Sequence, residues 1–348
     1  MSHSCPKLPV LCGLATALFV ALPAAAVEPV PDSVGWRGFG IFGVGYADLE
    51  SNLVAGNRLI DIGPEVNTSI FQRPRGDSTV HPAITGEVNY TFGNGFQAFI
   101  GTSLEDAVTL DAVSQLGLRK NLAGAGTLQV GLLFSGITTQ AWEDPYAENV
   151  ARQETDRDST GVRVQWDRIM DSAFEATVSY RSIDFDTERS GQGVTSVACD
   201  LACQRLLRRD GDQIAFDLAY MHRIGGAPNH LLRPSVGYTI DNRDGDAVAG
   251  NSYRLQLSYV YAQPSYTLTG NIVYGQSRRD ARNPLFGTRT DEDRLALNAT
   301  WFYRLPIAGG RWQAVTNVLW GREDSDVRFH ESNLFMVSVG AMYRFGTP

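Results

Sequence analysis

The feature that most constrains this chain is an alternation of apolar and polar residues with a period of two, which recurs along most of its length. In residues 84–92 (ITGEVNYTF) the even positions are apolar or small and the odd positions are polar. The same pattern recurs in residues 127–135, 174–181, 213–220, 254–261 and 294–304. A period of two indicates a β-strand with one apolar and one polar face. No segment shows a sustained helical period, so the sequence predicts an all-β fold.

The links between these strands alternate between short and long. Short links are expected at residues 93–95, 121–126, 167–172, 224–229, 263–265 and 305–310. Longer polar links are expected at residues 50–81, 139–158, 185–211, 241–250, 278–291 and 321–332, with a brief one near 104–108. Short periplasmic turns and long extracellular loops are typical of a transmembrane antiparallel β-barrel, and the spacing predicts about 14 strands.

A soluble β-sandwich is the main alternative, because its strands also alternate. Sandwich strands are shorter, however, at about 5–6 residues. The apolar face here also ends in aromatic residues at many strand margins, as in the girdles at the two membrane interfaces. These aromatic residues are Phe92, Phe96, Trp166, Tyr220, Tyr238, Tyr261, Tyr266, Trp301, Tyr303, Trp312 and Trp320. The pattern therefore favours a membrane barrel.

The N-terminus has the pattern of a cleavable export signal. Lys7 precedes an apolar stretch at residues 8–22, and Ala24-Ala25-Ala26 supplies small residues for cleavage. The stretch is short for a transmembrane helix, which needs about 20 residues. We therefore expect three parts: a signal peptide at 1–26, a short periplasmic leader at 27–35 and a barrel at 36–345. The expected location is the outer membrane of a gram-negative bacterium.

The last strand indicates how such a barrel is assembled. Its end, Ser338-x-Gly340-x-x-Tyr343-x-Phe345, resembles the terminal signal that delivers outer-membrane barrels to their insertion machinery. The residues Gly346-Thr347-Pro348 follow the usual terminal aromatic residue, which is a small departure. We expect Tyr343 and Phe345 to contact the insertion machinery, and the barrel surface to contact lipids and lipopolysaccharide.

Several segments resemble a family of bacterial outer-membrane proteins known as domain of unknown function 2860. These segments are residues 38–46 (GFGIFGVGY), 50–57 (ESNLVAGN), 90–95 (YTFGNG) and 101–108 (GTSLEDAV). The resemblance implies a barrel over the whole mature chain. It implies no activity, because the family has none assigned.

Charged residues on the polar faces of the strands are expected to line the lumen. The candidates are Glu87, Arg163, Glu175, Arg181, Asp217, Arg233, Arg254 and Arg294, with Arg119, Arg223, Arg304, Arg344 and Asp111 on the same faces. Arginine predominates, and arginine rings favour anions in pores. The alternative is that these residues pair across strands and only hold the lumen together. The whole chain has a formal net charge of −8, which argues against a nucleic-acid partner.

The sequence offers little for catalysis or for metal binding. Cys199 and Cys203 suit a disulfide that closes one turn of an extracellular loop, because C-x₃-C without a nearby histidine is a poor metal site. The acidic run at residues 241–246 reads as a turn more readily than as a calcium loop. His330 lies near Asp324 and Asp326, but no hydrolase motif is present. We expect no catalytic residue, no metal and no cofactor.

Three functions remain in order of preference. The first is a passive porin-like channel for small hydrophilic solutes with a weak preference for anions, either monomeric or trimeric. The second is a closed or loop-plugged barrel that binds a ligand, lipid or partner, and the third is an outer-membrane hydrolase. Residues 50–81 bear on this choice, because their apolar side chains are poorly placed in water and this loop is able to fold inward. These side chains are Leu53, Val54, Leu59, Ile60 and Ile62.

Overall fold

The computed structural model describes residues 30–58, 60–102, 113–225 and 229–346. The signal peptide expected at 1–26, the brief loop expected at 104–108, Leu59 and Asp111 lie outside these residues. In the described part, no helix is long and apolar enough to span a bilayer.

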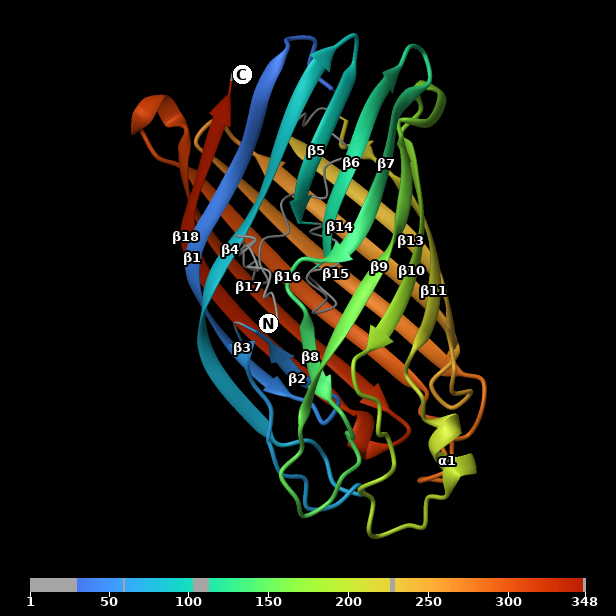
Figure 1. Ribbon diagram of the computed structural model, residues 1–348. Helices are drawn as coiled ribbons and strands as arrows, with labels where there is room; N and C mark the ends of the chain where they lie inside the picture. Colours follow the sequence, from blue (N-terminus) through green and yellow to red (C-terminus); the bar gives the residue numbers. More distant parts are fainter. Residues whose placement is uncertain (1–29, 59, 103–112, 226–228, 347–348) are drawn as a thin grey trace, which may run out of the picture.

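Fourteen antiparallel strands of the described chain form a closed wall, because the last strand pairs with the first (Figure 1). They are β1 (Gly35–Glu50), β4 (Gly76–Gly93), β5 (Phe96–Thr102), β6 (Val113–Leu122), β7 (Gly126–Ser135), β9 (Glu154–Asp167), β10 (Phe174–Phe185), β11 (Gly211–Tyr220), β13 (His230–Arg243), β14 (Gly250–Ala262), β15 (Tyr266–Arg279), β16 (Glu292–Arg304), β17 (Trp312–Ser325) and β18 (Ser332–Gly346). The predicted all-β barrel of about 14 strands is confirmed.

Shorter elements complete the sheet and the loops. β8 (Thr139–Trp142) pairs with the first residues of β9, and β2 (Val54–Asn57) pairs with both β8 and β3 (Ile60–Asp61). β12 (His222–Arg223) pairs with β13. The helix α1 (Leu201–Leu206) lies in a long loop, and the 3-10 turns are η2 (Ile169–Asp171), η3 (Ala308–Gly310) and η4 (Arg328–His330).

The two ends of the barrel differ, as the sequence predicted. The short links gather at the upper end in Figure 1, and the long loops with α1 gather at the lower end. We call these the short-turn end and the long-loop end. Several loop boundaries were wrong: β9 begins at Glu154 and β17 continues to Ser325, both inside expected loops. β4 likewise begins at Gly76, so residues 76–81 belong to a strand instead of a loop. The reason is that β1 is long enough to pair with them, up to Glu50 opposite Gly76.

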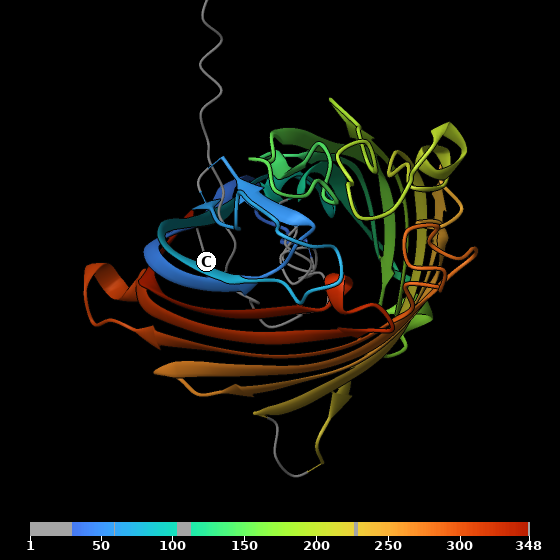
Figure 2. The same cartoon turned by 90° about the horizontal axis from the view of Figure 1, so that it is seen from below.

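The alternation of faces also follows the prediction. On β4, Thr91 points inward and is fully buried, whereas the neighbouring Phe92 is 53% exposed on the outside. Leu132, Val236 and Val339 are outward and exposed in the same way. Viewed from the long-loop end, the strands close into a ring (Figure 2). A closed sheet with an apolar outer surface is what a bilayer requires, because lipid cannot satisfy an open strand edge.

Outward aromatic side chains flank this apolar surface at both ends. Near the short-turn end the rings of Trp36, Tyr90, Phe92 and Phe96 form a chain of contacts with centroids 4.9–5.6 Å apart. Near the long-loop end Tyr238 packs against Tyr253 at 5.0 Å. Two such belts are typical of the interfaces of a membrane barrel.

Candidate functional site

The structure places all eight candidate lumen residues at inward positions of the wall. Three carboxylates among them pair with guanidinium groups: Glu87 with Arg119 at 2.7 Å, Glu175 with Arg233 at 2.8 Å, and Asp217 with Arg254 at 2.5 Å. Arg294 pairs with Glu323 of β17 at 2.5 Å, a partner that the sequence analysis did not single out. Arg163 and Arg181 are buried at inward positions of β9 and β10. Many of these charges are therefore paired with one another, and the inner surface is still rich in arginine.

A continuous chain of side-chain hydrogen bonds crosses the inner face of β4 to β13. Arg119 donates to both oxygens of Glu87 at 2.7 Å and to Gln129 Oε1 at 2.7 Å. Gln129 donates to Gln165 at 3.3 Å, and Gln165 donates to Glu175 at 2.8 Å. Charge-assisted hydrogen bonds are among the stronger ones, so this belt holds neighbouring strands in register.

Four charged residues and two glycines lie in one register-matched row across six strands. The row runs Asp217, Gly237, Arg254, Gly275, Arg294 and Glu323, from β11 to β17. A side chain at Gly237 would meet Asp217 Oδ1 at 2.4 Å, because Arg254 reaches across this glycine to Asp217. We call this row the charged row.

The charged row faces water-accessible space. The side chains of Arg254 and Arg294 point into the barrel, yet 34% and 47% of their surfaces are exposed. An inward side chain keeps such exposure only where the space in front of it is not filled. Within the described residues, no side chain fully covers these two arginines.

The inner face of β16, β17, β18 and β1 also carries a buried apolar cluster, which the sequence analysis did not predict. Its residues are Phe302, Val315, Leu319, Met336, Met342, Ile41, Ala47 and Leu49, all buried in one cluster. The sequence of the last strand did indicate an apolar inner face, because Met336 and Met342 alternate there with outward Phe335 and Tyr343. Both faces of that strand are therefore partly apolar.

The β2–β3 hairpin lies inside the barrel against this apolar face. Val54, Ile60 and Ile62 belong to the same cluster as Leu49 and Met336 of the wall. Between hairpin and wall is a small apolar pocket. Its lining is Ala47, Leu49, Val54, Gly56, Asn57, Ile60, Ile62, Leu334 and Met336. Part of the loop at 50–81 is thus folded inward, where it narrows the lumen.

The long loops form a common layer over the long-loop end. A second apolar cluster joins Ile70, Tyr146, Leu207, Ala247, Leu285, Val327 and Phe329, which come from six different loops. Tyr146 stacks on Phe329 with centroids 5.3 Å apart, and Phe286 packs against both. We call this layer the loop cap. The residues of the cap are far apart in sequence, so tertiary contacts between the loops hold the cap together.

Buried charged groups tie the loops of the cap together. Glu148 accepts hydrogen bonds from the backbone N–H of Ile70, Thr195 and Ser196 at 2.8–3.1 Å. Burial alone would raise the pKa of Glu148, but these donors lower it to about 2. Arg152 donates to the carbonyl oxygens of Asn52 at 2.8 Å and Pro145 at 3.2 Å. One carboxylate and one guanidinium thus each bridge separate loops.

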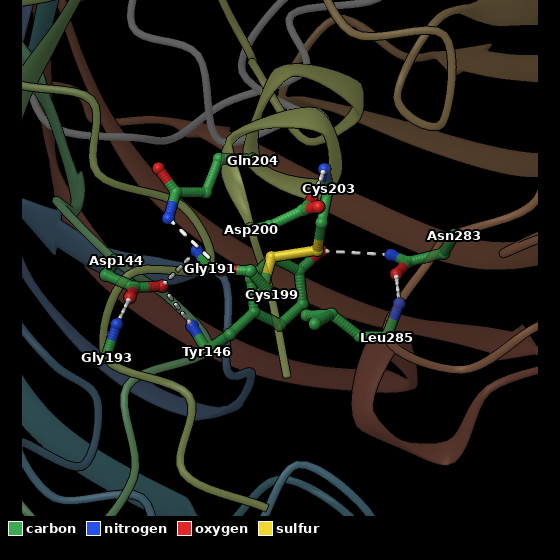
Figure 3. Close-up of a disulfide and its surroundings, with 10 residues drawn as sticks. All are labelled: Asp144, Tyr146, Gly191, Gly193, Cys199, Asp200, Cys203, Gln204, Asn283 and Leu285. Atoms are coloured by element: carbon green, nitrogen blue, oxygen red, sulfur yellow. Dashed lines mark hydrogen bonds between the residues drawn. A yellow bond between two sulfur atoms is a disulfide. The ribbon is translucent and has the colours of Figure 1, made fainter. Parts of the chain in front are cut away.

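The structure joins Cys199 and Cys203 in a disulfide at the start of α1 (Figure 3). The pair packs against the apolar cluster of the cap. Nearby, Asp144 accepts hydrogen bonds from the N–H groups of Tyr146, Gly191 and Gly193 at 2.6–3.0 Å. The disulfide therefore fixes the loop that Asp144 and Glu148 anchor.

His330 is placed differently from the Asp–His pair considered from the sequence. Asp324 accepts from Arg322 instead, on the outer side of β17. His330 Nε2 lies 3.2 Å from Tyr146 Oη inside the cap, and burial raises the pKa of Tyr146 to about 12. Tyr146 and His330 thus share a hydrogen bond inside the cap. Within the described residues, no three His, Cys, Asp or Glu side chains are grouped to hold a metal.

At the short-turn end, Val30, which precedes β1, contacts the inner face of the wall. Val30 is 3% exposed, its N–H donates to Asn121 Oδ1 at 3.1 Å, and its carbonyl accepts from Asn121 Nδ2 at 2.8 Å. Asn121 Oδ1 also accepts from Thr127 at 2.9 Å. The leader therefore narrows this mouth. Tyr343 lies at the outer surface here, against Trp312 at 4.8 Å.

Acidification is expected to loosen the loop cap. Burial lowers the pKa of His330 from 6.5 to about 3. A base with a lowered pKa in the folded cap contributes stability that is present above about pH 6.5 and is lost as the pH falls toward 3. Between about pH 7 and about pH 5, we expect hydrogen exchange in residues 143–149 and 326–331, corrected for the intrinsic rate, to become roughly tenfold faster. His330→Gln should change this dependence, and an unchanged profile would contradict the role of His330.

Comparisons with known proteins found one matching family model and several similar solved structures. A sequence model described as protein of unknown function (DUF2860) matches residues 35–344. Curated proteins gave no match. Similar solved structures include a Pseudomonas aeruginosa FadL homologue (13% identity, TM-score 0.43, 89% of this chain and 91% of that chain) and an outer membrane channel from Pseudomonas putida F1 (11%, 0.45, 92% and 99%). Another is a mutant of the monoaromatic hydrocarbon channel TodX (9%, 0.47, 92% and 93%).

Proposed function

The chain belongs to the family of proteins of unknown function DUF2860, and we propose that it is a passive channel of the gram-negative outer membrane with a weak preference for small anions. The observation that carries the proposal is the charged row, where Arg254 and Arg294 are inside the closed wall and still reach solvent. A barrel of about 14 strands is wide enough to leave space inside, because eight strands are just filled by their own side chains.

The membrane location is supported by the outer surface. The apolar band, the two aromatic belts and the closed sheet meet the requirements of a bilayer. The anion preference is supported by the inner surface of the described β4 to β14, where guanidinium groups outnumber carboxylates. Among the inner residues singled out from the sequence, the cations are Arg119, Arg163, Arg181, Arg233 and Arg254, and the anions are Glu87, Glu175 and Asp217. Asp167 and Asp241 also face inward, as do Arg157 and Arg243. Fixed charges that line a narrow pore set its ion selectivity.

A second function, that of a closed barrel that binds a ligand or partner, is supported by a separate observation. The loop cap and the inward hairpin both narrow the lumen, which suits a barrel that binds a ligand or partner and passes nothing. A hydrolase gains no support from His330, because its contacts are Tyr146 at 3.2 Å and, at 3.9 Å, Glu292.

Single-channel recording of the refolded protein in a planar bilayer tests the proposal. Under a KCl gradient, we expect stable open steps and a reversal potential on the anion side. Arg254→Glu should move the reversal potential toward cations, because it reverses one charge beside the open part of the lumen. Arg322→Glu is the matched control, since Arg322 lies on the outer side of β17. Silent bilayers would favour the closed barrel, and a cation-selective wild type would contradict the anion preference.

A further inference from the structure

Four arginines gather at the short-turn end of the barrel, on the neighbouring strands β16, β17, β18 and β1, where the C-terminus lies (Figure 1). Arg304 is the last residue of β16, Arg311 directly precedes β17, and Arg344 and Arg37 lie two residues from the ends of β18 and β1. By the alternation of these strands, Arg304, Arg344 and Arg37 occupy inward positions. We call these four residues the mouth arginines.

Two of the mouth arginines extend across glycines toward the other two. A Cβ at Gly310 would lie 3.2 Å from Cδ of Arg304, and a Cβ at Gly346 would lie 2.8 Å from Cγ of Arg37. The side chain of Arg304 therefore lies over the turn that carries Arg311, and the side chain of Arg37 lies over the end of β18. From strand spacing and rise, the Cα atoms of successive mouth arginines are roughly 5–8 Å apart. A small anion is therefore within reach of two or three of them at once.

The mouth arginines differ from the arginines of the charged row, each of which is held by a carboxylate. Within the described residues, no carboxylate forms an ion pair with any mouth arginine. The links at 263–265 and 305–311 contain no Asp or Glu, and Asp32, which precedes β1, is the nearest described acidic residue in sequence. Arg304, Arg311 and Arg344 are exposed, and Arg37 is half-buried. Their charges are thus accessible to a solute at this end of the lumen.

Like charges on neighbouring strands destabilise a sheet, and a bound anion relieves this repulsion. Guanidinium groups bind phosphate groups through pairs of parallel N–H···O bonds. We infer that the mouth arginines bind a small soluble anion that carries a phosphate group. This inference rests on the proposed function, because it names the class of anion that the channel favours and the place where the anion binds. The inward positions of Arg304 and Arg344 favour a phosphate group in water over a lipid headgroup, which lies on the outer side of the wall.

Block of the chloride current by pyrophosphate, with acetate as the monovalent control, tests the site in planar bilayers of zwitterionic lipid. Pyrophosphate should block from one chamber only, at a concentration at least about tenfold lower than acetate, because it contacts more than one guanidinium group. Arg344→Gln should raise the half-blocking concentration of pyrophosphate about tenfold by removing a charged partner.

Arg223→Gln is the matched control, because it removes the same charge from the same end of the barrel. Arg223 is exposed on β12, which pairs with β13, three strands away from β16. At 0.1 M salt, charges separated by more than about 10 Å are largely screened. Arg223→Gln should therefore change the half-blocking concentration of pyrophosphate by less than about twofold. Resistance of the folded band to SDS without heating confirms that each variant is folded.

Equal block by pyrophosphate and acetate, or equal weakening by Arg344→Gln and Arg223→Gln, would overturn the site while the channel stands. If the bilayers are silent, the channel itself fails, and titration calorimetry of the folded protein in detergent tests the site alone. Pyrophosphate binding that Arg344→Gln weakens and Arg223→Gln does not would support it, and the absence of binding heat at several temperatures would overturn it. Tighter binding of short-chain phosphatidylglycerol than of pyrophosphate, lost in Arg344→Gln, would assign the arginines to lipid and overturn the soluble anion.

Discussion

Replacing residues 54–61 with a short Gly–Ser linker is expected to increase the single-channel conductance several-fold. These residues form the β2–β3 hairpin, which leaves the wall and packs on the apolar inner face. The hairpin contributes no strand to the closed ring, since β1 pairs directly with β18 and with β4. Its removal therefore widens the lumen and leaves the ring intact.

The matched control keeps the hairpin and weakens its packing. Ile60 is 3% exposed against the wall, and Ile60→Ser replaces its apolar contact with a hydroxyl that has no partner there. We expect this variant to show frequent transitions between the wild-type conductance and a larger one. Equal conductance of the wild type and the deletion variant would mean that the narrowest point lies elsewhere, at the loop cap or at the leader beside Asn121. Recording both variants in the same salt separates these cases.

The outer surface was predictable from the sequence because the bilayer dictates it. Each strand must present apolar residues to lipid at every second position, and Val88, Tyr90 and Phe92 do so without reference to any other strand. The short turns follow from the same argument, since glycine and asparagine mark them at Gly93-Asn94-Gly95. Local patterns thus determine the strands, their number and their outward faces.

The lumen was predictable only in part, because its arrangement depends on which residues lie opposite one another. Asp217 reaches Arg254 across Gly237, and this contact requires the register of three strands to be known to the residue. The buried apolar cluster on the inner face was missed because the sequence analysis assumed that every inward position is polar. This assumption holds for β10 but fails for Met336 and Met342 of β18. A side chain that faces the lumen must only be compatible with its neighbours, so it can be polar or apolar. The character of the inner face therefore follows no period along the sequence.

The loop cap was not predictable for a related reason. Its contacts join residues far apart in the chain, such as Glu148 with Ile70 and Arg152 with Asn52. Glu148 and Arg152 look like ordinary charged loop residues in sequence. Only the structure shows that each is buried and bridges separate loops.

Substituting alanine for Gly43 is expected to prevent most of the protein from forming a closed barrel. Gly43 of β1 lies opposite Gly340 of β18, at the seam where the first strand meets the last. A Cβ at Gly43 would lie 2.3 Å from the carbonyl oxygen of Val339 and 2.8 Å from Gly340 Cα. Both are backbone atoms, so the two strands must separate to admit even one methyl group.

The separation at this seam costs more than an ordinary packing change. Overpacking a well-packed site typically costs about 1–3 kcal/mol, and here the strain also opens backbone hydrogen bonds in a region where lipid offers no replacement. Gly321→Ala is the matched control: it is also an inward glycine, but its Cβ would meet only Ala296 and the backbone of Leu295, at 3.8 and 4.0 Å. The measurement is the fraction of refolded protein that migrates as a compact band in SDS without heating. A large loss for Gly43→Ala with wild-type folding of Gly321→Ala would locate closure at the Gly43–Gly340 contact, and equal folding of the two variants would show that the seam tolerates a wider spacing than the structure has.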